Sequence, residues 1–349
     1  MGFRALASEV IRVSLVLAIS FAVVGLIIVV TGENALKVFQ ILIQSAFGSV
    51  QGFCDTLAAA TPLTLTGLAT AIAFRAGLFN VGVEGSLYLG AFAAAWVGFT
   101  FTSLSRIVIL FAAFVLAMLA GGVWALGPGI VKVKYNVDEI VTTLMLNYIA
   151  IFGTTYLVTY IYGVPGFANA MSYPVAAQAR LTRLAPPSQL NTGFVIAIVC
   201  AAICWLFIKY SVYGYELRIF GTNPVFAKWV GMPNHAIAIR SMFLSGALGG
   251  VAGAVQILGI HYRFIANFSP GFGYTGIAVA LLAKNNPLAV IFSALLLGAI
   301  YNGESIVELM TNIPMEIPRI FEGIIIALTS AQYILPRIKI IRGDKNANK

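Results

Sequence analysis

Long uninterrupted apolar runs constrain this chain more than any other feature of its sequence. Stretches such as 13–30 and 107–127 contain no charged residue, and about 20 apolar residues form a helix that crosses about 30 Å of hydrocarbon. A membrane barrel would instead show short strands of alternating polarity. Only 9% of the residues are charged, against about a quarter in soluble domains. The sequence therefore predicts an all-α polytopic membrane protein.

About ten segments have the length and the apolar character of a transmembrane helix. An even number of spans puts both termini on the same side of the membrane. We place the predicted spans at about 13–30, 57–74, 84–101, 107–127, 139–162, 192–209, 239–260, 272–284, 287–307 and 318–335.

The Lys and Arg residues indicate which side of the membrane holds the termini. Cytoplasmic loops carry an excess of these residues. With the N-terminus inside, most of the 21 Lys and Arg residues fall in cytoplasmic segments. Those left outside are Lys37, Arg106, Arg180, Arg183, Arg263 and Arg319. Both termini are therefore predicted to be cytoplasmic, and residues 1–349 are expected to form one transmembrane domain.

Two of the predicted external segments are long enough to contact an extracytoplasmic partner. Residues 35–50 place Leu36, Phe39 and Ile43 at helical spacing, which predicts an amphipathic helix at the outer surface. Residues 163–191 are rich in Pro and small polar residues. They predict an ordered external loop.

A polar break separates two of the spans at 74–90, where the sequence reads FRAGLFNVGVEGSLYLG. Arg75, Asn80 and Glu84 stand there among glycines, which let backbones approach closely. Non-helical backbone at membrane depth is tolerated only against protein or a water-filled path. Two interpretations stay open. The break is either an ordinary turn at the membrane surface or part of the lining of a substrate path. A separate interpretation of Glu84 is that it simply neutralises Arg75.

Polar and aromatic residues near this break are candidates for a solute path. Polar side chains in apolar helices are costly unless they pair with one another, with a ligand or with water. Amides and aromatic rings also bind ring-bearing solutes weakly. Pairing or packing within the protein explains any single residue equally well. The candidates are Phe79, Asn80, Glu84, Asn147, Tyr148, Phe272, Tyr274 and Asn302.

A predicted cytoplasmic segment at 210–240 carries strong local signals. Residues 221–224, GTNP, predict a turn with Thr222 or Asn223 as the N-cap of a short helix. That helix would run from 224 to 230 and would end at Gly231. Its large aromatic side chains would lie on the surface, which favours a docked partner over a merely solvated loop.

A weak internal repeat favours a transporter architecture. Residues 66–75 read TGLATAIAFR and residues 275–284 read TGIAVALLAK, and a Leu-Gly-Ala string follows each copy. Both copies run from outside to inside in the predicted topology, so the repeat is parallel. Chance similarity between two helices rich in Ala and Leu is the alternative.

Three strings resemble the permease subunits of bacterial ATP-binding-cassette importers of the nucleoside and simple-sugar branch. They are ATPLTLTGLATAIAFRAGLFNVGVEGSLYLGA at 60–91, VDEIVTTLMLNYIA at 137–150 and GYELRIFGTNPVFAKWVGM at 214–232. The resemblance covers nearly the whole chain and is greatest to the larger permease of the nucleoside type. The string at 301–305, YNGES, together with Glu308, is more acidic than that family leads us to expect. This leaves the exact solute open.

The resemblance implies a multi-pass protein of the bacterial cytoplasmic membrane that imports a nucleoside-like solute by alternating access. It also implies three partners: a cytoplasmic ATP-binding subunit, a second homologous permease and an extracytoplasmic solute-binding lipoprotein. Riboflavin-like or simple-sugar solutes are the alternatives within this class. The coupling contacts to the ATPase that it implies are Gly221, Asn223, Pro224, Ala227, Lys228, Trp229 and Gly231.

Catalytic function is not expected of this chain. The G-x-x-x-x-G-K-[ST] phosphate loop is absent from the sequence, so ATP hydrolysis is expected in a separate subunit. The only histidines, His235 and His261, fall on opposite sides of the membrane in the predicted topology, and we expect no metal or cofactor. An ion-coupled secondary transporter is the remaining alternative. It would place ionisable groups near the midplane, whereas Glu84 and Glu304 lie near the ends of spans.

Overall fold

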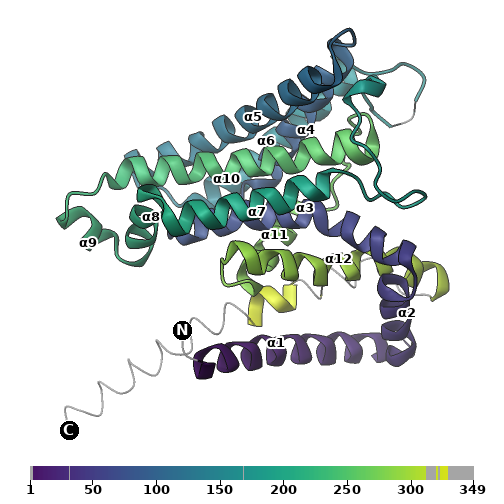
Figure 1. Ribbon diagram of the computed structural model, residues 1–349, viewed down its shortest axis with the longest axis horizontal. Helices are drawn as coiled ribbons and strands as arrows, with labels where there is room; N and C mark the ends of the chain where they lie inside the picture. The colour runs from purple at the N-terminus through teal and green to yellow at the C-terminus, as the bar shows by residue number, and fades with distance from the viewer. Residues whose placement is uncertain (1–2, 31, 168, 312–319, 321–322, 329–349) are drawn as a thin grey trace. The chain divides into compact units, whose positions relative to one another are not determined.

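The structure is a computed structural model that describes all residues except 1–2, 31, 168, 312–319, 321–322 and 329–349. Among the described residues the regular elements are helices, and β pairing is limited to isolated bridges such as Gly163 with Ser172 (Figure 1). The all-helical prediction is therefore confirmed. The chain divides into two compact units, residues 1–49 with 299–349, and residues 50–298.

The smaller unit contains α1 (Phe3–Val30) and α2 (Ala35–Phe47). A helix, α2, occupies most of the segment 35–50 that the sequence predicts to be helical, but it ends at Phe47, and Val50 begins α3. The N-cap of α2 is Asn34, whose Oδ1 accepts hydrogen bonds from the amides of Leu36 and Lys37. Satisfying these otherwise unpaired amides fixes where the helix begins.

The larger unit is built from membrane-length helices joined by short connections. Two of its helices, α6 and α10, continue into single π-helical segments, Leu157–Ile161 and Ile257–His261. The helices are α3 (Val50–Arg75), α4 (Val83–Thr100), α5 (Arg106–Tyr135), α6 (Glu139–Tyr156), α7 (Gly193–Tyr210), α8 (Val212–Thr222), α9 (Pro224–Trp229), α10 (Asn234–Gln256), α11 (Phe272–Leu282) and α12 (Pro287–Met310), the last of which continues beyond this unit.

Six helices in the described part of the chain are long and apolar enough to cross a membrane: α3, α5, α6, α7, α10 and α12. Helices also occupy the predicted spans 13–30, 84–101 and 272–284. However, α11 has only 11 residues and is therefore about 16 Å long, roughly half the hydrocarbon thickness. The predicted span 318–335 lies mostly outside the described residues.

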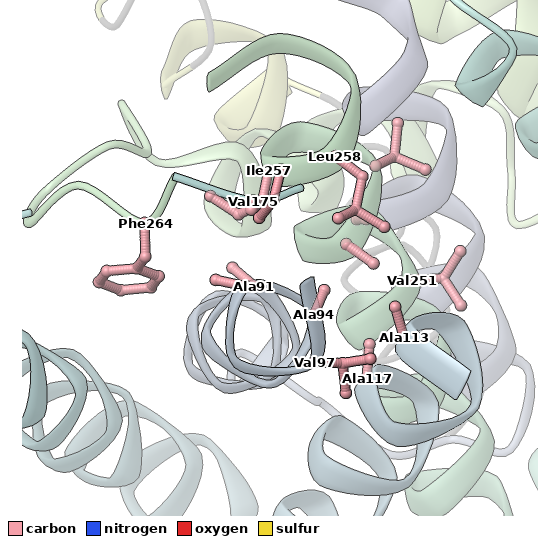
Figure 2. Close-up of a cluster of buried hydrophobic side chains, with 14 of the residues drawn as sticks. Ala91, Ala94, Val97, Ala113, Ala117, Val175, Val251, Ile257, Leu258 and Phe264 are labelled. Atoms are coloured by element: carbon pink, nitrogen blue, oxygen red, sulfur yellow. The ribbon is translucent and has the colours of Figure 1, made fainter. Parts of the chain in front are cut away.

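Small residues bring α4, α5 and α10 into close contact at the centre of the larger unit. Gly90 of α4 and Gly121 of α5 both face Gly250 of α10, so closely that an added methyl group would overlap backbone atoms. Such small-residue contacts are the usual way in which membrane helices gain packing energy. Figure 2 shows the buried side chains around this contact, including Ala91, Ala94, Ala113, Ala117 and Val251.

The loop 163–191 and helix α9 lie at opposite ends of the larger unit (Figure 1). The described residues of the loop are held in place, as predicted, because their backbone bonds to the surrounding helices and turns. Ala176 N donates to Gly98 O at 2.9 Å, and Leu181 N donates to Leu258 O at 2.8 Å. Arg106 reaches this loop and donates to Thr182 Oγ1 at 2.6 Å.

The two copies of the internal repeat lie side by side in α3 and α11. A methyl group added to Gly276 would lie 2.8 Å from Thr66, and the Arg75 Nε donates to the Asn285 carbonyl at 2.6 Å. The beginnings of the two copies are therefore close, and so are their ends. The copies run in the same direction, as the sequence predicts.

Candidate functional site

The polar break between α3 and α4 is held by a buried amide. Asn80, which is 1% exposed, accepts a hydrogen bond from Gly82 N at 2.8 Å and donates to Ser245 Oγ of α10 at 2.8 Å. Buried non-helical backbone must find partners within the protein. Asn80 supplies one of these partners and fixes the break to α10.

A second amide, Asn147 of α6, reaches the same break from the other side. Its Oδ1 accepts from Gly85 N at 2.8 Å, and its Nδ2 donates to Val81 O at 2.9 Å. The first amides of a helix have no partner within the helix. Asn147 therefore caps α4 although it belongs to a different helix. The same Nδ2 also lies 3.2 Å from the Tyr274 hydroxyl of α11.

Glu84, in the first turn of α4, is 2% exposed and accepts a 2.5 Å hydrogen bond from Gly273 N of α11. The Arg75 guanidinium instead donates to the Asn285 carbonyl. The interpretation in which Glu84 neutralises Arg75 is therefore wrong. The Nε of Arg75 thus bonds the loop that follows α11, whereas Glu84 points from α4 toward the start of α11.

The structure brings together four of the predicted path residues, Asn80, Glu84, Asn147 and Tyr274, around residues 80–85. Phe272, one residue before Gly273, packs against the buried hydrophobic cluster of Figure 2. Three residues at the break were not predicted from the sequence: Ser245, Gly273 and Thr143, whose Oγ1 accepts from Val81 N at 3.3 Å. Their only signal was the small-residue content of the helices that carry them.

Two other predicted path residues have exposed rings. Phe79 is 49% exposed and packs on Phe74, with ring centroids 4.6 Å apart. Tyr148, next to Asn147, is 52% exposed and stacks on Phe152, with centroids 6.3 Å apart and ring planes 23° from parallel. Asn302 lies in the smaller unit, where its Nδ2 donates to Ser45 O at 3.4 Å.

The predicted short helix of the 210–240 segment is confirmed as α9, Pro224–Trp229. Its N-cap is Asn223, whose Oδ1 accepts from Phe226 N at 2.9 Å. Gly231 follows the helix with φ +80°, a conformation that favours glycine. Both ends of the helix therefore follow from local sequence signals.

Helix α9 presents an apolar and aromatic surface to its surroundings. Trp229 is 85% exposed, and Val225, Phe226 and Val230 are also exposed. Ala227 is the buried residue of this helix, whereas Lys228 is exposed. Four adjacent large hydrophobic side chains on one short helix form a patch that typically marks a protein contact.

Gly221 does not belong to the turn that the string at 221–224 predicts. Helix α8 continues through Thr222, so the turn begins at Asn223 rather than at Gly221. A side chain at Gly221 would overlap the carbonyl of Arg75, and Gly77, in the turn that follows α3, also contacts Gly221. Glycine is required here because two backbones meet.

Hydrogen bonds tie α8 and α9 to the start of α10. Asn234 Nδ2 donates to Pro224 O at 2.8 Å. The Tyr213 hydroxyl of α8 lies 3.0 Å from both Ile237 O and Ser241 Oγ, and burial raises the pKa of this phenol. The hydroxyl donates to the Ile237 carbonyl, which can only accept.

Membrane-length helices around a buried polar break, with an exposed aromatic helix at one end, define a membrane permease. Among the described residues, no group of three or more His, Cys, Asp or Glu side chains is placed to hold a metal ion. The chain belongs to the family described as branched-chain amino acid transport system / permease component, whose model matches residues 52–330. It is thus a multi-pass membrane protein and a transport component.

Named relatives cover nearly the whole chain. It is 34% identical to the guanosine ABC transporter permease protein NupP of Bacillus subtilis, over 93% of this chain and 94% of the relative. It is 29% identical to the nucleoside ABC transporter permease protein NupB of Lactococcus lactis, over 94% of each chain. It is 28% identical to the glucose ABC transporter permease protein TsgB13 of Haloferax volcanii, over 94% of this chain and 89% of the relative. No solved structure matches the chain.

Proposed function

We propose that this chain is a membrane-spanning subunit of an ATP-driven importer that moves a nucleoside-like solute across the cytoplasmic membrane by alternating access. The relatives named for guanosine and nucleoside transport support the solute class, and the relative named for glucose keeps a sugar as the alternative. In this proposal residues 1–349 form one permease domain with about ten spans and cytoplasmic termini.

The observation that carries the solute path is the position of Tyr148. It lies about 14 Å along α6 from Glu139, which is near the middle of a bilayer about 30 Å thick, and its ring is half exposed. A phenol that faces hydrocarbon would leave its hydroxyl without a partner, which costs free energy. A water-filled path between two permease subunits removes this cost. We therefore assign the exposed face of α6 to that path.

The surroundings of Tyr148 fit a solute with an aromatic ring. Phe152 stacks on it and is 67% exposed, so the pair offers ring faces on which a nucleobase could stack. Asn147 and Tyr274 lie behind this surface.

The other candidates border this path in different ways. Asn80 and Glu84 hold the backbone of the break, so they shape the path without an exposed surface. Phe79 offers an exposed ring beside the break. Phe272 and Asn302 remain proposed path residues by sequence.

Energy from ATP enters through α9 in this proposal. Trp229 and Phe226 would fill a groove of the cytoplasmic ATPase, with Lys228 at its edge. Movement of α9 reaches α8 through the continuous backbone at Asn223, and it reaches the end of α3 through the contact of Gly221 with Arg75. The polar break comes directly after the end of α3 in the chain. Closure of the ATPase would therefore shift the backbone segment that Asn80 and Asn147 hold in place.

Two further partners complete the proposed importer. A second homologous permease would cover the exposed face of α6. A solute-binding lipoprotein would dock at the end of the larger unit that carries the loop 163–191. There the guanidinium carbons of Arg180 and Arg183 lie 4.9 Å and 5.7 Å from the centre of the Tyr262 ring. These exposed cations fit an acidic partner surface.

Uptake by the complete importer in proteoliposomes tests the solute path. Tyr148→Leu and Tyr274→Ala should slow guanosine uptake about fivefold or more, because stacking of a base on an aromatic ring contributes about 1–3 kcal/mol. Phe111→Leu on α5 is the matched control, since Phe111 is 70% exposed but lies away from the break. ATPase activity with the unloaded binding protein should not change in any of the three variants.

Three outcomes would contradict parts of the proposal. Unchanged uptake by Tyr148→Leu would remove α6 from the path. A binding protein that retains only an amino acid, a peptide or a metal ion would remove the nucleoside assignment. Uptake that survives loss of ATP hydrolysis but stops when an ion gradient collapses would identify a secondary transporter.

A further inference from the structure

A small pocket with three cationic side chains lies at the α9 end of the larger unit. Arg75 ends α3, Lys209 lies in the last turn of α7, and Arg218 belongs to α8. The pocket has a volume of about 130 Å³. The remaining lining residues are Trp205, Ile208, Asn286 and Pro287.

None of these three cations is neutralised by an acidic side chain of the described residues. Arg75 uses its Nε for the Asn285 carbonyl, and Arg218 uses its Nε for the Gly214 carbonyl at 3.3 Å. Lys209 lies 4.6 Å from the centre of the Trp205 ring. No carboxylate pairs with any of the three in the described part of the chain. Three like charges around one pocket repel each other, and a bound anion would remove this repulsion.

The chemistry of the lining selects a phosphate group. Guanidinium groups bind phosphate through two parallel hydrogen bonds, and the terminal nitrogens of Arg75 and Arg218 are not used by the described residues. Helix α12 begins at Pro287, so its positive N-terminal end adds to the attraction. The volume lies below the roughly 300–1,000 Å³ of sites for whole small molecules, so one charged group fits better than an entire nucleoside.

The location of the pocket indicates where this phosphate comes from. Two membrane-length helices end at the pocket and a third begins there, which places it at the membrane interface. Trp205 is typical of that zone. Beside the pocket, Ile203 and Leu206 of α7 are 58% and 49% exposed, which suits contact with acyl chains.

We propose that this pocket binds a phosphate group, supplied by the headgroup of an anionic phospholipid in the leaflet on the α9 side. Basic pockets between membrane helices on the cytoplasmic side bind such headgroups. The bound lipid would hold the ends of α3 and α7 and the start of α12 together, next to the contact between Gly221 and Arg75. This site does not depend on the identity of the imported solute.

The test uses the full-length chain, purified with its partner subunits and placed in nanodiscs of phosphatidylcholine, with or without phosphatidylglycerol. Lys209→Gln combined with Arg218→Gln removes two of the cations, and Lys134→Gln is the control, because Lys134 is an exposed cation near the end of α5 that does not line the pocket. Bound phosphatidylglycerol is counted by native mass spectrometry, and the unfolding temperature is measured in both membranes. Inorganic phosphate is added to the phosphatidylcholine nanodiscs as a separate arm.

Phosphatidylglycerol should raise the unfolding temperature of the wild type and of Lys134→Gln. The double variant should bind this lipid roughly 25-fold more weakly, since each cation near an anionic lipid contributes about fivefold, and should lose most of the temperature shift. An equal shift in the double variant would overturn the proposal. Equal stabilisation by inorganic phosphate alone would overturn the lipid assignment. Loss of the ATPase subunit from the double variant with unchanged lipid binding would assign the pocket to protein docking and would also overturn it. These readouts need no solute, so failure here is separate from failure of the proposed transport function.

Discussion

Replacing Asn147 with leucine tests whether one side chain holds the polar break. In the structure Asn147 is fully buried, accepts from Gly85 N and donates to Val81 O. Leucine has similar size but supplies neither bond. A buried backbone group without a partner costs about 1–3 kcal/mol, so loss of both partners should lower the free energy of unfolding by about 2–6 kcal/mol.

A matched variant separates these backbone bonds from the side-chain network. Tyr274→Phe removes only the 3.2 Å bond between Asn147 Nδ2 and the Tyr274 hydroxyl. Hydrogen bonds between membrane helices contribute about 0.6 kcal/mol on average. Tyr274→Phe should therefore destabilise the protein several-fold less than Asn147→Leu.

Reversible unfolding in mixed detergent, followed by the fluorescence of the four Trp residues, measures both variants against the wild type. Asn147→Asp adds a third comparison, because it keeps an acceptor for Gly85 N but loses the donor to Val81 O. Its destabilisation should exceed that of Tyr274→Phe, because it loses the donor to Val81 O and adds the desolvation cost of a buried carboxylate. The reasoning is refuted if Asn147→Leu is no less stable than Tyr274→Phe, since the backbone groups would then have found other partners.

Three further outcomes follow from the packing. Gly221→Val should reduce uptake and detach α8 from α3, because its side chain would overlap the Arg75 carbonyl; normal uptake and normal disulfide cross-linking between introduced cysteines on the two helices would contradict this. Trp229→Asp should abolish copurification of the ATPase, while the free energy of unfolding stays within about 0.5 kcal/mol of the wild-type value. A stable complex of this variant with the ATPase would argue against α9 as the docking helix. Phe264→Ala should lower the free energy of unfolding by about 3–5 kcal/mol, because Phe264 is fully buried. A much smaller loss in the same unfolding assay would contradict this and would show that neighbouring side chains fill the space.

Elements that have local causes could be predicted from the sequence alone. Apolar runs of membrane length predict helices because a bilayer offers backbone groups no other partners. The ends of α9 follow from Asn223 and Gly231, since a capping side chain and a residue that accepts positive φ act within a few positions of the chain. The polar break was also visible, because charged and amide side chains interrupt otherwise apolar sequence.

The pairing of polar groups across the helix bundle could not be predicted from the sequence. Asn147 caps α4 from another helix, Glu84 bonds the start of α11 rather than Arg75, and Gly221 serves a backbone contact rather than a turn. Helical periodicity gives the face on which a side chain lies, but not which helix packs against that face. The choice among partners depends on contacts far apart in sequence, such as Gly90 against Gly250, whose energies arise only after the helices have assembled.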